Sequence, residues 1–213
     1  MKKYIIILLV LLAPLMYAES VNSLINDFNQ KNNYRRRYRA IYLLSKRKYI
    51  PILEKFTEIM TLSHHQMRES AGSLHRMRRM ISYYLVFYTG VEYGKIKSYV
   101  SQFLVYLNTS YDLDTSSILI VSLSKIINKG GDLNHKVQII KRIQSVVYKM
   151  RRLSSTNAYY RANKERIIRR ILTALTIVKH KSALKVLRKM GEMNLREKHL
   201  QRIRKIIDTH YSS

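Results

Sequence analysis

The sequence predicts an all-α protein, and three observations carry that prediction. Apolar residues recur at helical spacing from residue 34 almost to the end of the chain. Only two prolines and six glycines interrupt 213 residues, which favours long helices. No segment alternates apolar and polar residues in the manner of a half-buried strand. The sequence therefore favours helices packed on helices over any architecture that contains a sheet.

Residues 1–18 form a segment distinct from the helical part. Lys2 and Lys3 precede an apolar run that ends at Ala18, which is the layout of a secretory signal peptide. The run is shorter than the roughly 20 residues that a membrane-spanning helix needs. We expect a secreted or periplasmic protein, cleaved after Ala18, with no transmembrane span in the mature chain. Met16 stands where a smaller residue is preferred, so an uncleaved membrane anchor is the alternative.

Downstream of this signal peptide we expect one domain. The mature chain would have 195 residues (213 minus 18), enough to bury a core without covalent links. The absence of cysteine agrees with that expectation. The expected parts are a lead-in segment at 19–33, a helical domain at 34–208 and a C-terminal tail at 209–213.

Helical spacing places the first helices of this domain. An apolar face predicts a helix over 34–44. Pro51 is tolerated in the first turn of a helix, so we expect it to open the next one. Further apolar stripes predict helices over 65–88 and 96–107, with a pair of glycines between them.

The second half of the domain follows the same pattern. Asp114-Thr-Ser predicts an N-cap, and the run at 118–127 is apolar on nearly every side. A helix of that kind is expected to be covered by neighbours on both flanks. Apolar spacing then predicts helices over 137–150, 167–178, 183–190 and 200–207.

Two helix pairs are similar to one another in sequence. Residues 40–56 align with residues 174–190, and both contain a helix end, a short basic turn and a second helix. Ser82-Tyr-Tyr-Leu-Val-Phe and Ser122-Leu-Ser-Lys-Ile-Ile stand at comparable points in two middle pairs. The resulting separations of about 40 to 50 residues are within the range of two-helix repeats. The chain at this point resembles the HEAT-repeat family, in Lys164-Glu-Arg-Ile-Ile-Arg-Arg-Ile-Leu-Thr-Ala-Leu175 followed by Ser182-Ala-Leu-Lys-Val-Leu-Arg-Lys-Met190.

The resemblance is clearest at residues 164–190 and 38–56. It implies a right-handed α-solenoid of about four helical hairpins over 34–208. Residues 177–182 lack the aspartate and glycine that the family carries in the turn within a repeat. An irregular helical bundle is therefore the alternative fold.

Positive charge is the main functional signal. The formal charge is +27, and it becomes +25 without Lys2 and Lys3 because all thirteen acids lie downstream. Guanidinium groups bind phosphates and carboxylates through paired hydrogen bonds. The anion-binding candidates are Arg35, Arg36, Arg39, Arg47, Arg78, Arg79, Arg151, Arg152, Arg166, Arg169 and Arg170.

The signal peptide decides which anion we expect. Nucleic acid is the usual partner of so basic a chain, but an exported protein meets other polyanions. We expect a non-catalytic scaffold that binds an anionic envelope polymer, an anionic lipid surface or an acidic protein. A nucleic-acid-binding repeat protein is the alternative.

An enzyme acting on envelope polymers is a third and weaker interpretation. Its first acids to test would be Glu92 and Asp114, and no catalytic motif singles them out. His64, His65 and His75 lack the spacing of a zinc site, and capping explains Asp112 and Asp114 better than metal binding does. We therefore predict no catalytic residues, no metal and no cofactor.

Overall fold

The structure is a computed structural model that describes residues 19–30, 33–61, 71–110, 112–153 and 158–211. The signal-peptide prediction at 1–18, His64 and His65 lie outside these ranges. Secondary structure in the described part is helical, apart from an isolated bridge between Thr89 and Val91. The helices are α2 (Val21–Asn29), α3 (Tyr34–Lys46), α4 (Ile52–Thr61), α6 (Ala71–Tyr84), the 3-10 helix η1 (Leu85–Tyr88), α7 (Tyr93–Thr109), α8 (Leu113–Gly130), α9 (Leu133–Leu153), α10 (Ala158–Val178), α11 (Ala183–Gly191) and α12 (Glu197–Tyr211). The prediction of an all-α protein is confirmed.

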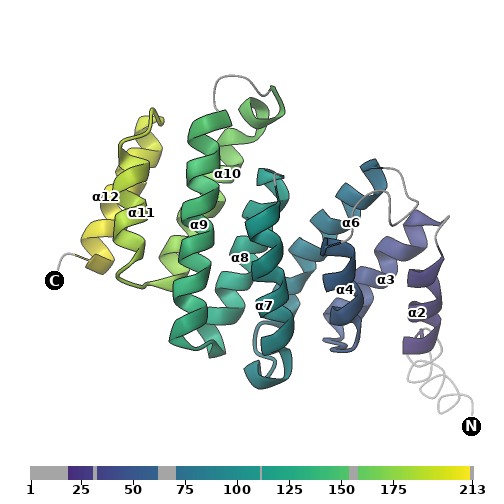
Figure 1. The fold of residues 1–213 in the computed structure, drawn as a ribbon. Coiled ribbons are helices and arrows are strands. Elements are labelled where there is room, and N and C mark those ends of the chain that lie inside the picture. Colours follow the sequence, from purple (N-terminus) through teal and green to yellow (C-terminus); the bar gives the residue numbers. More distant parts are fainter. Residues whose placement is uncertain (1–18, 31–32, 62–70, 111, 154–157, 212–213) are drawn as a thin grey trace, which may run out of the picture.

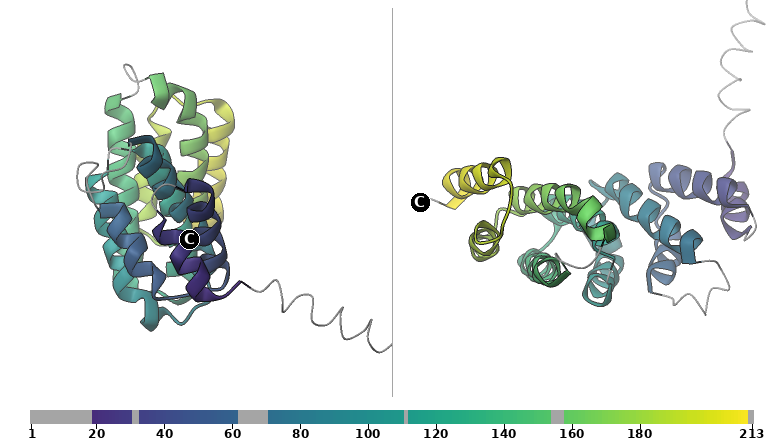
Figure 2. Two further views of the ribbon diagram at one scale, coloured as in Figure 1. Left: turned by 90° about the vertical axis from the view of Figure 1, so that its right-hand side faces the viewer. Right: turned by 90° about the horizontal axis from the view of Figure 1, so that it is seen from above.

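The helices stand in two rows (Figures 1 and 2). One row contains α3, α6, α8, α10 and α12, and each of these helices packs on the next. The other row contains α4, α7, α9 and α11, which also pack in order. Helix α2 packs on α3 at the N-terminal end, and α12 lies at the opposite end. Among the described helices, none is long and apolar enough to cross a bilayer.

Helix α8 is the most enclosed element. It packs on α6, α7, α9, α10 and η1. Its residues from Leu113 to Ile120 are all buried, and Leu119, Leu123 and Ile127 have no exposed surface. This confirms the expectation that neighbours cover the helix on both flanks. The physical reason is that a helix with apolar residues all round has no face that water solvates well.

The helix predicted over 65–88 differs from the observed one. Its described part is α6 up to Tyr84, and the backbone then tightens into η1. Gly90 follows with a φ of 94°, a conformation that glycine adopts without the steric cost of a Cβ. The chain therefore turns sharply before α7 begins.

The lead-in segment expected at 19–33 contains a helix that periodicity did not indicate. Ser20 caps α2 by accepting a hydrogen bond from the Ser23 N–H at 3.0 Å. Leu24 and Phe28 lie one turn apart and are buried against α3. With only two core residues, α2 offers too short an apolar stripe for the sequence pattern to reveal.

The N-cap of α8 is Asp112 rather than the Asp114-Thr-Ser segment that the sequence suggested. The Asp112 carboxylate accepts a hydrogen bond from the Thr115 N–H at 3.1 Å. It also lies 2.9 Å from His75 Nδ1. Asp114 is already inside the helix and fully buried, and it serves a different purpose.

Candidate functional site

A buried carboxylate holds two arginines together at the N-terminal end of α8. Asp114 is 0 % exposed, and its Oδ2 lies 3.2 Å from Arg79 of α6. Its Oδ1 accepts a hydrogen bond from Arg170 of α10 at 2.5 Å. Arg170 also donates to Ser117 Oγ at 3.2 Å. We call these residues, with Tyr83, the Asp114 cluster.

Tyr83 lies beside both guanidinium groups of this cluster. The two groups are 6.0 Å (Arg79) and 5.8 Å (Arg170) from the centre of its ring, within the range of a cation–π contact. Its hydroxyl accepts a hydrogen bond from Arg170 at 2.8 Å. The cluster thus joins α6, α8 and α10, and its guanidiniums are engaged with groups of the protein itself.

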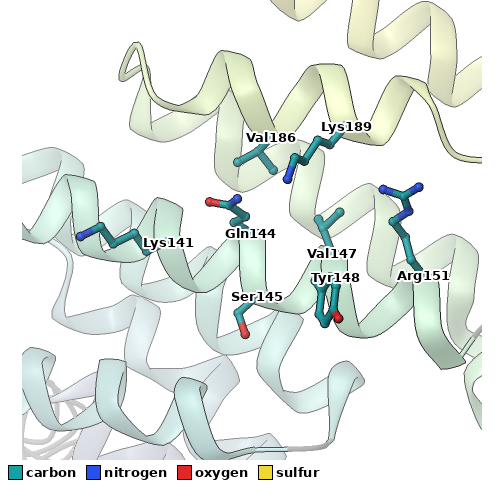
Figure 3. Close-up of a pocket in the computed structure, with 8 residues that line it drawn as sticks. All are labelled: Lys141, Gln144, Ser145, Val147, Tyr148, Arg151, Val186 and Lys189. Carbon is teal, nitrogen blue, oxygen red and sulfur yellow. The ribbon is translucent and has the colours of Figure 1, made fainter.

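A pocket lies elsewhere, between α9 and α11 (Figure 3). Its volume is about 310 Å³. We call it the α9–α11 groove, and its lining residues are Lys141, Gln144, Ser145, Val147, Tyr148 and Arg151 of α9 with Val186 and Lys189 of α11. Three of the eight are basic and none is acidic. The groove therefore presents a positive potential to whatever enters it.

Helical spacing brings these side chains to the groove. Lys141, Gln144, Tyr148 and Arg151 are separated by three or four positions, so they follow one another along α9. Figure 3 shows Lys141 and Arg151 at opposite ends of this stretch, while Val186 and Lys189 point from α11 toward α9. The spacing of these four residues is visible in the sequence, but only Arg151 among them was predicted as an anion-binding residue.

An exposed aromatic residue borders the groove. Tyr148 is 60 % exposed. It belongs to the lining of the groove, but its ring points away from α11 (Figure 3). The Arg152 guanidinium is 5.7 Å from the centre of its ring. Arg151 and Arg152, both predicted as anion-binding residues, therefore lie on or beside the groove.

The arginines predicted on α3 contact the N-terminal residues of the described chain. Arg39 lies 2.9 Å from the Glu19 carboxylate, and Arg47 donates to the Glu19 carbonyl at 2.6 Å. Arg36 lies 3.7 Å from Asp27 of α2. Arg35 is exposed on the same helix. Arg36, Arg39 and Arg47 therefore connect α3 to the residues that precede it in the chain.

The remaining predicted arginines lie on α6 and α10. Arg78 donates to the Ile59 carbonyl at 3.0 Å and stands over the Tyr106 ring, so it joins α6 to α4 and α7. Arg166 donates to Asn163 of its own helix. Arg169 is exposed on α10. The candidate arginines are thus divided among the Asp114 cluster, the α9–α11 groove and separate contacts.

A second acidic site lies between α10 and the start of α12. The Glu165 carboxylate is 2.9 Å from Lys198 Nζ and 2.9 Å from His199 Nε2. The Lys198 ammonium and the His199 ring lower the pKa of Glu165 to about 2. A small cleft of about 190 Å³ adjoins it, lined in part by Lys164 and Arg196. These contacts hold Glu165 ionised and attach α12 to α10.

Ser101, His135 and Asp132 lie in the order of a catalytic triad. Ser101 Oγ is 3.0 Å from His135 Nε2, and His135 Nδ1 is 2.8 Å from Asp132 Oδ1. Acyl transfer also needs an open path to the nucleophile and donors for an oxyanion. His135 is only 3 % exposed, and Ser101 lies within α7 with its hydroxyl donating to the Lys97 carbonyl. Within a helix the backbone N–H groups donate to carbonyl groups of the preceding turn, so those near Ser101 are not available to an oxyanion.

These three residues instead connect α7 to the first turn of α9. The His135 N–H donates to Asp132 at 2.9 Å, as at a capped helix N-terminus. That bond and the Lys97 ammonium, 3.0 Å from Asp132 Oδ2, hold the pKa of Asp132 well below its usual range. Sequence spacing did not reveal this contact because Ser101 lies within α7, whereas Asp132 lies just before the start of α9.

The two acids named for an enzyme have different partners. Glu92 is exposed and pairs with Lys95 at 2.9 Å, whereas Asp114 is buried with its two arginines. His75 pairs with Asp112 at 2.9 Å. Within the described ranges, no three His, Asp or Glu side chains gather in a way that could hold a metal ion.

Comparison with known proteins finds no family model, no curated protein and no solved structure that matches the chain. The case for a function therefore rests on the charge and geometry described above.

Proposed function

We propose that the protein is an exported, non-catalytic scaffold that binds an anionic envelope component or an acidic protein partner. Its proposed architecture is a right-handed, HEAT-like α-solenoid. The two rows of helices, each packed in sequence order, support that architecture, because stacked helical pairs bury one continuous core.

The α9–α11 groove is the observation that carries this proposal. Lys141, Arg151 and Lys189 line it without an acidic neighbour in the lining. The arginines of the Asp114 cluster contact a buried carboxylate and an aromatic ring, so that cluster serves the packing of three helices. With a charge of +25 expected after cleavage (+27 minus two lysines), the whole chain also attracts polyanions over long range.

Binding to polyanions across salt concentrations tests the proposal. The purified full chain is titrated into fluorescent poly-glutamate and, in parallel, into vesicles that contain anionic lipid. Binding should weaken steeply between about 0.05 and 0.3 M salt, because exposed charges are screened within about 10 Å at 0.1 M. Neutral dextran is the control polymer. Absent or salt-insensitive binding to both anions would exclude the proposal.

A nucleic-acid partner is the second candidate. It is favoured by exposed Tyr148, which lies beside Arg151 and Arg152, because aromatic and guanidinium groups together stack on bases. Cell fractionation with N-terminal sequencing separates the two candidates. A chain that begins at Met1 in the cytosol and binds single-stranded RNA more tightly than poly-glutamate would favour nucleic acid.

A further inference from the structure

We infer that helix α3 docks the protein on an anionic lipid bilayer. The docking surface is the solvent side of this helix, which we call the α3 face: Arg35, Arg39, Tyr42 and Lys46, with Tyr34 and Tyr38 along one edge. Helix α3 lies toward the opposite end of the helix rows from α9 and α11 (Figure 1). The α3 face is therefore a second binding surface, separate from the groove on which the proposed function rests.

Helix α3 is basic along its whole length. Residues 34–46 include four arginines and one lysine but no aspartate or glutamate, and Arg47 and Lys48 follow directly. Positions 35, 39, 42 and 46 fall on one side of the helix, opposite its buried residues. The Arg39 side chain remains 59 % exposed although it pairs with Glu19. A row of basic residues on an amphipathic helix is attracted to anionic lipid headgroups.

Tyrosine rings accompany these cations. Tyr34, Tyr38 and Tyr42 follow one another at intervals of four positions; Tyr34 is 36 % exposed, and the other two are half-buried. The Lys46 ammonium lies 5.9 Å from the centre of the Tyr42 ring, and the Phe87 ring of η1 lies 6.0 Å from the same centre. Tyrosine combines an apolar ring with a polar hydroxyl, so it is enriched where a bilayer meets water. The α3 face thus has both kinds of side chain that favour this interface.

The junction with the N-terminal segment selects a bilayer over other anions. Glu19 is the first described residue, and α3 holds it by two contacts: Arg39 lies 2.9 Å from its carboxylate, and Arg47 donates to its carbonyl at 2.6 Å. The apolar run at 1–18 ends one residue earlier. One residue spans at most about 3.6 Å. If that run occupies a bilayer, the α3 face has to lie at the surface of the same bilayer.

Cleavage of the signal peptide would keep this surface positive. Cleavage after Ala18 would leave the new α-amino group on Glu19, beside Arg39 and Arg47. An ammonium group at that position adds one more cation to the α3 face. The attraction to anionic headgroups is therefore expected in the mature chain as well as in the uncleaved one.

Introduced tryptophans show which surface meets the bilayer. The chain has no tryptophan, so a single one reports its own surroundings. Tyr34→Trp places it on the α3 face, and Tyr148→Trp places it on α9 at the more exposed of the two positions. Each full-length variant is mixed with vesicles that contain phosphatidylglycerol and, in parallel, with vesicles of phosphatidylcholine alone. Fluorescence emission should shift to the blue only for Tyr34→Trp and only with the anionic vesicles, because indole becomes less hydrated in the headgroup region.

Matched charge variants measure the electrostatic part. R35Q/K46Q removes two exposed cations from the α3 face, and K125Q/K205Q removes two exposed lysines from α8 and α12. One basic residue at an anionic membrane surface contributes about fivefold in affinity. Co-sedimentation with the anionic vesicles should therefore weaken at least about tenfold for R35Q/K46Q and less than about threefold for K125Q/K205Q. Both variants should bind poly-glutamate equally well, because they have the same net charge.

The outcomes separate membrane docking from the proposed function. Docking through α3 is overturned if Tyr34→Trp shows no shift, if Tyr148→Trp shifts as much, if neutral vesicles act like anionic ones, or if the two charge variants lose equally. A shift of Tyr34→Trp with single-stranded RNA as large as that with vesicles would also overturn it. In each case, salt-dependent binding of poly-glutamate leaves the proposed function standing. If neither vesicles nor poly-glutamate bind, both fail.

Thermal unfolding checks that each variant retains the fold. If R35Q/K46Q unfolds, the comparison of the two tryptophan variants decides alone.

Discussion

Arg170 donates a hydrogen bond to the carboxylate of Asp114, which precedes it by 56 positions in the sequence. The acceptor has no exposed surface, and the guanidinium has little. A buried ion pair of this kind gives little net stability against an apolar replacement, but removal of one partner leaves the other charge without compensation. The contact therefore specifies how α10 sits on α8.

Substitution of Asp114 should be among the most damaging single changes. Asp114→Ala leaves Arg79 and Arg170 without their shared carboxylate, and we expect the free energy of unfolding to fall by about 3–5 kcal/mol. Urea denaturation monitored by circular dichroism measures the loss. Glu92→Ala, at an exposed carboxylate paired with Lys95, should cost less than about 1 kcal/mol. Equal losses in the two variants would contradict the role given to Asp114.

Loss of the N-cap of α8 at Asp112 should destabilise the fold less than loss of Asp114. Asp112→Ala removes the acceptor for the Thr115 N–H, with an expected loss of about 1 kcal/mol in the free energy of unfolding. Asp112→Asn keeps an amide oxygen in the same place and should retain most of the cap. If Asn proved as damaging as Ala in the same denaturation experiment, the charge contact with His75, and not the cap, would be responsible.

The enclosed position of α8 predicts a large packing effect. Leu119→Ala removes a side chain with no exposed surface, and such truncations cost about 2–5 kcal/mol, depending on how far the cavity collapses. Val105→Ala on α7 is the control, because Val105 is 57 % exposed and its truncation should cost no more than about 0.5 kcal/mol. Chemical denaturation of both variants measures the contrast. If Leu119→Ala lowered the free energy of unfolding by less than Val105→Ala does, Leu119 would not be a core residue.

Glu165 predicts a pH dependence of stability at the acid end. Its pKa is lowered from 4.5 to about 2 in the folded chain by Lys198 and His199. A depressed pKa means that the ionised group stabilises the fold above the unfolded value, and this contribution is lost as the pH falls from 4.5 toward 2. Glu165→Gln should make stability less dependent on pH in that window. Urea unfolding from about pH 2 to pH 7 measures the free energy of unfolding as a function of pH, and Glu54→Gln is the control at an exposed carboxylate. If the free energy of unfolding of wild type and of Glu165→Gln depended on pH in the same way, the prediction would be wrong.

The sequence predicted the helices well because helix periodicity is a local property. The run at 118–127 was recognisable as a covered helix from its composition alone, and the described termini of α9 to α12 enclose the apolar stripes that predicted them. Helix α2 was missed because Leu24 and Phe28 are its only core residues. A pattern needs more repeats than two before it stands out.

The sequence predicted which types of residue form the sites, but not which of these residues contact one another. Arginine clusters were evident, but whether a guanidinium is engaged depends on partners distant in sequence, as with Arg170 and Tyr83, 87 positions apart. Asp114 looked like a cap because capping is the usual role of an aspartate ahead of an apolar run. The groove was missed because Lys189 and Val186 belong to a different helix from Lys141, and periodicity says nothing about which helices become neighbours.

The enclosure of α8 also determines how the molecule opens. Its amides are covered by α6, α7, α9, α10 and η1, so they can exchange hydrogen with solvent only when most of these neighbours have separated. Helices α2 and α12, at the two ends of the rows, can detach with far less lost contact. The chain is thus expected to unfold from its two ends inward, and the amides of α8 should exchange most slowly. The α9–α11 groove lies in the C-terminal half, next to the end formed by α12.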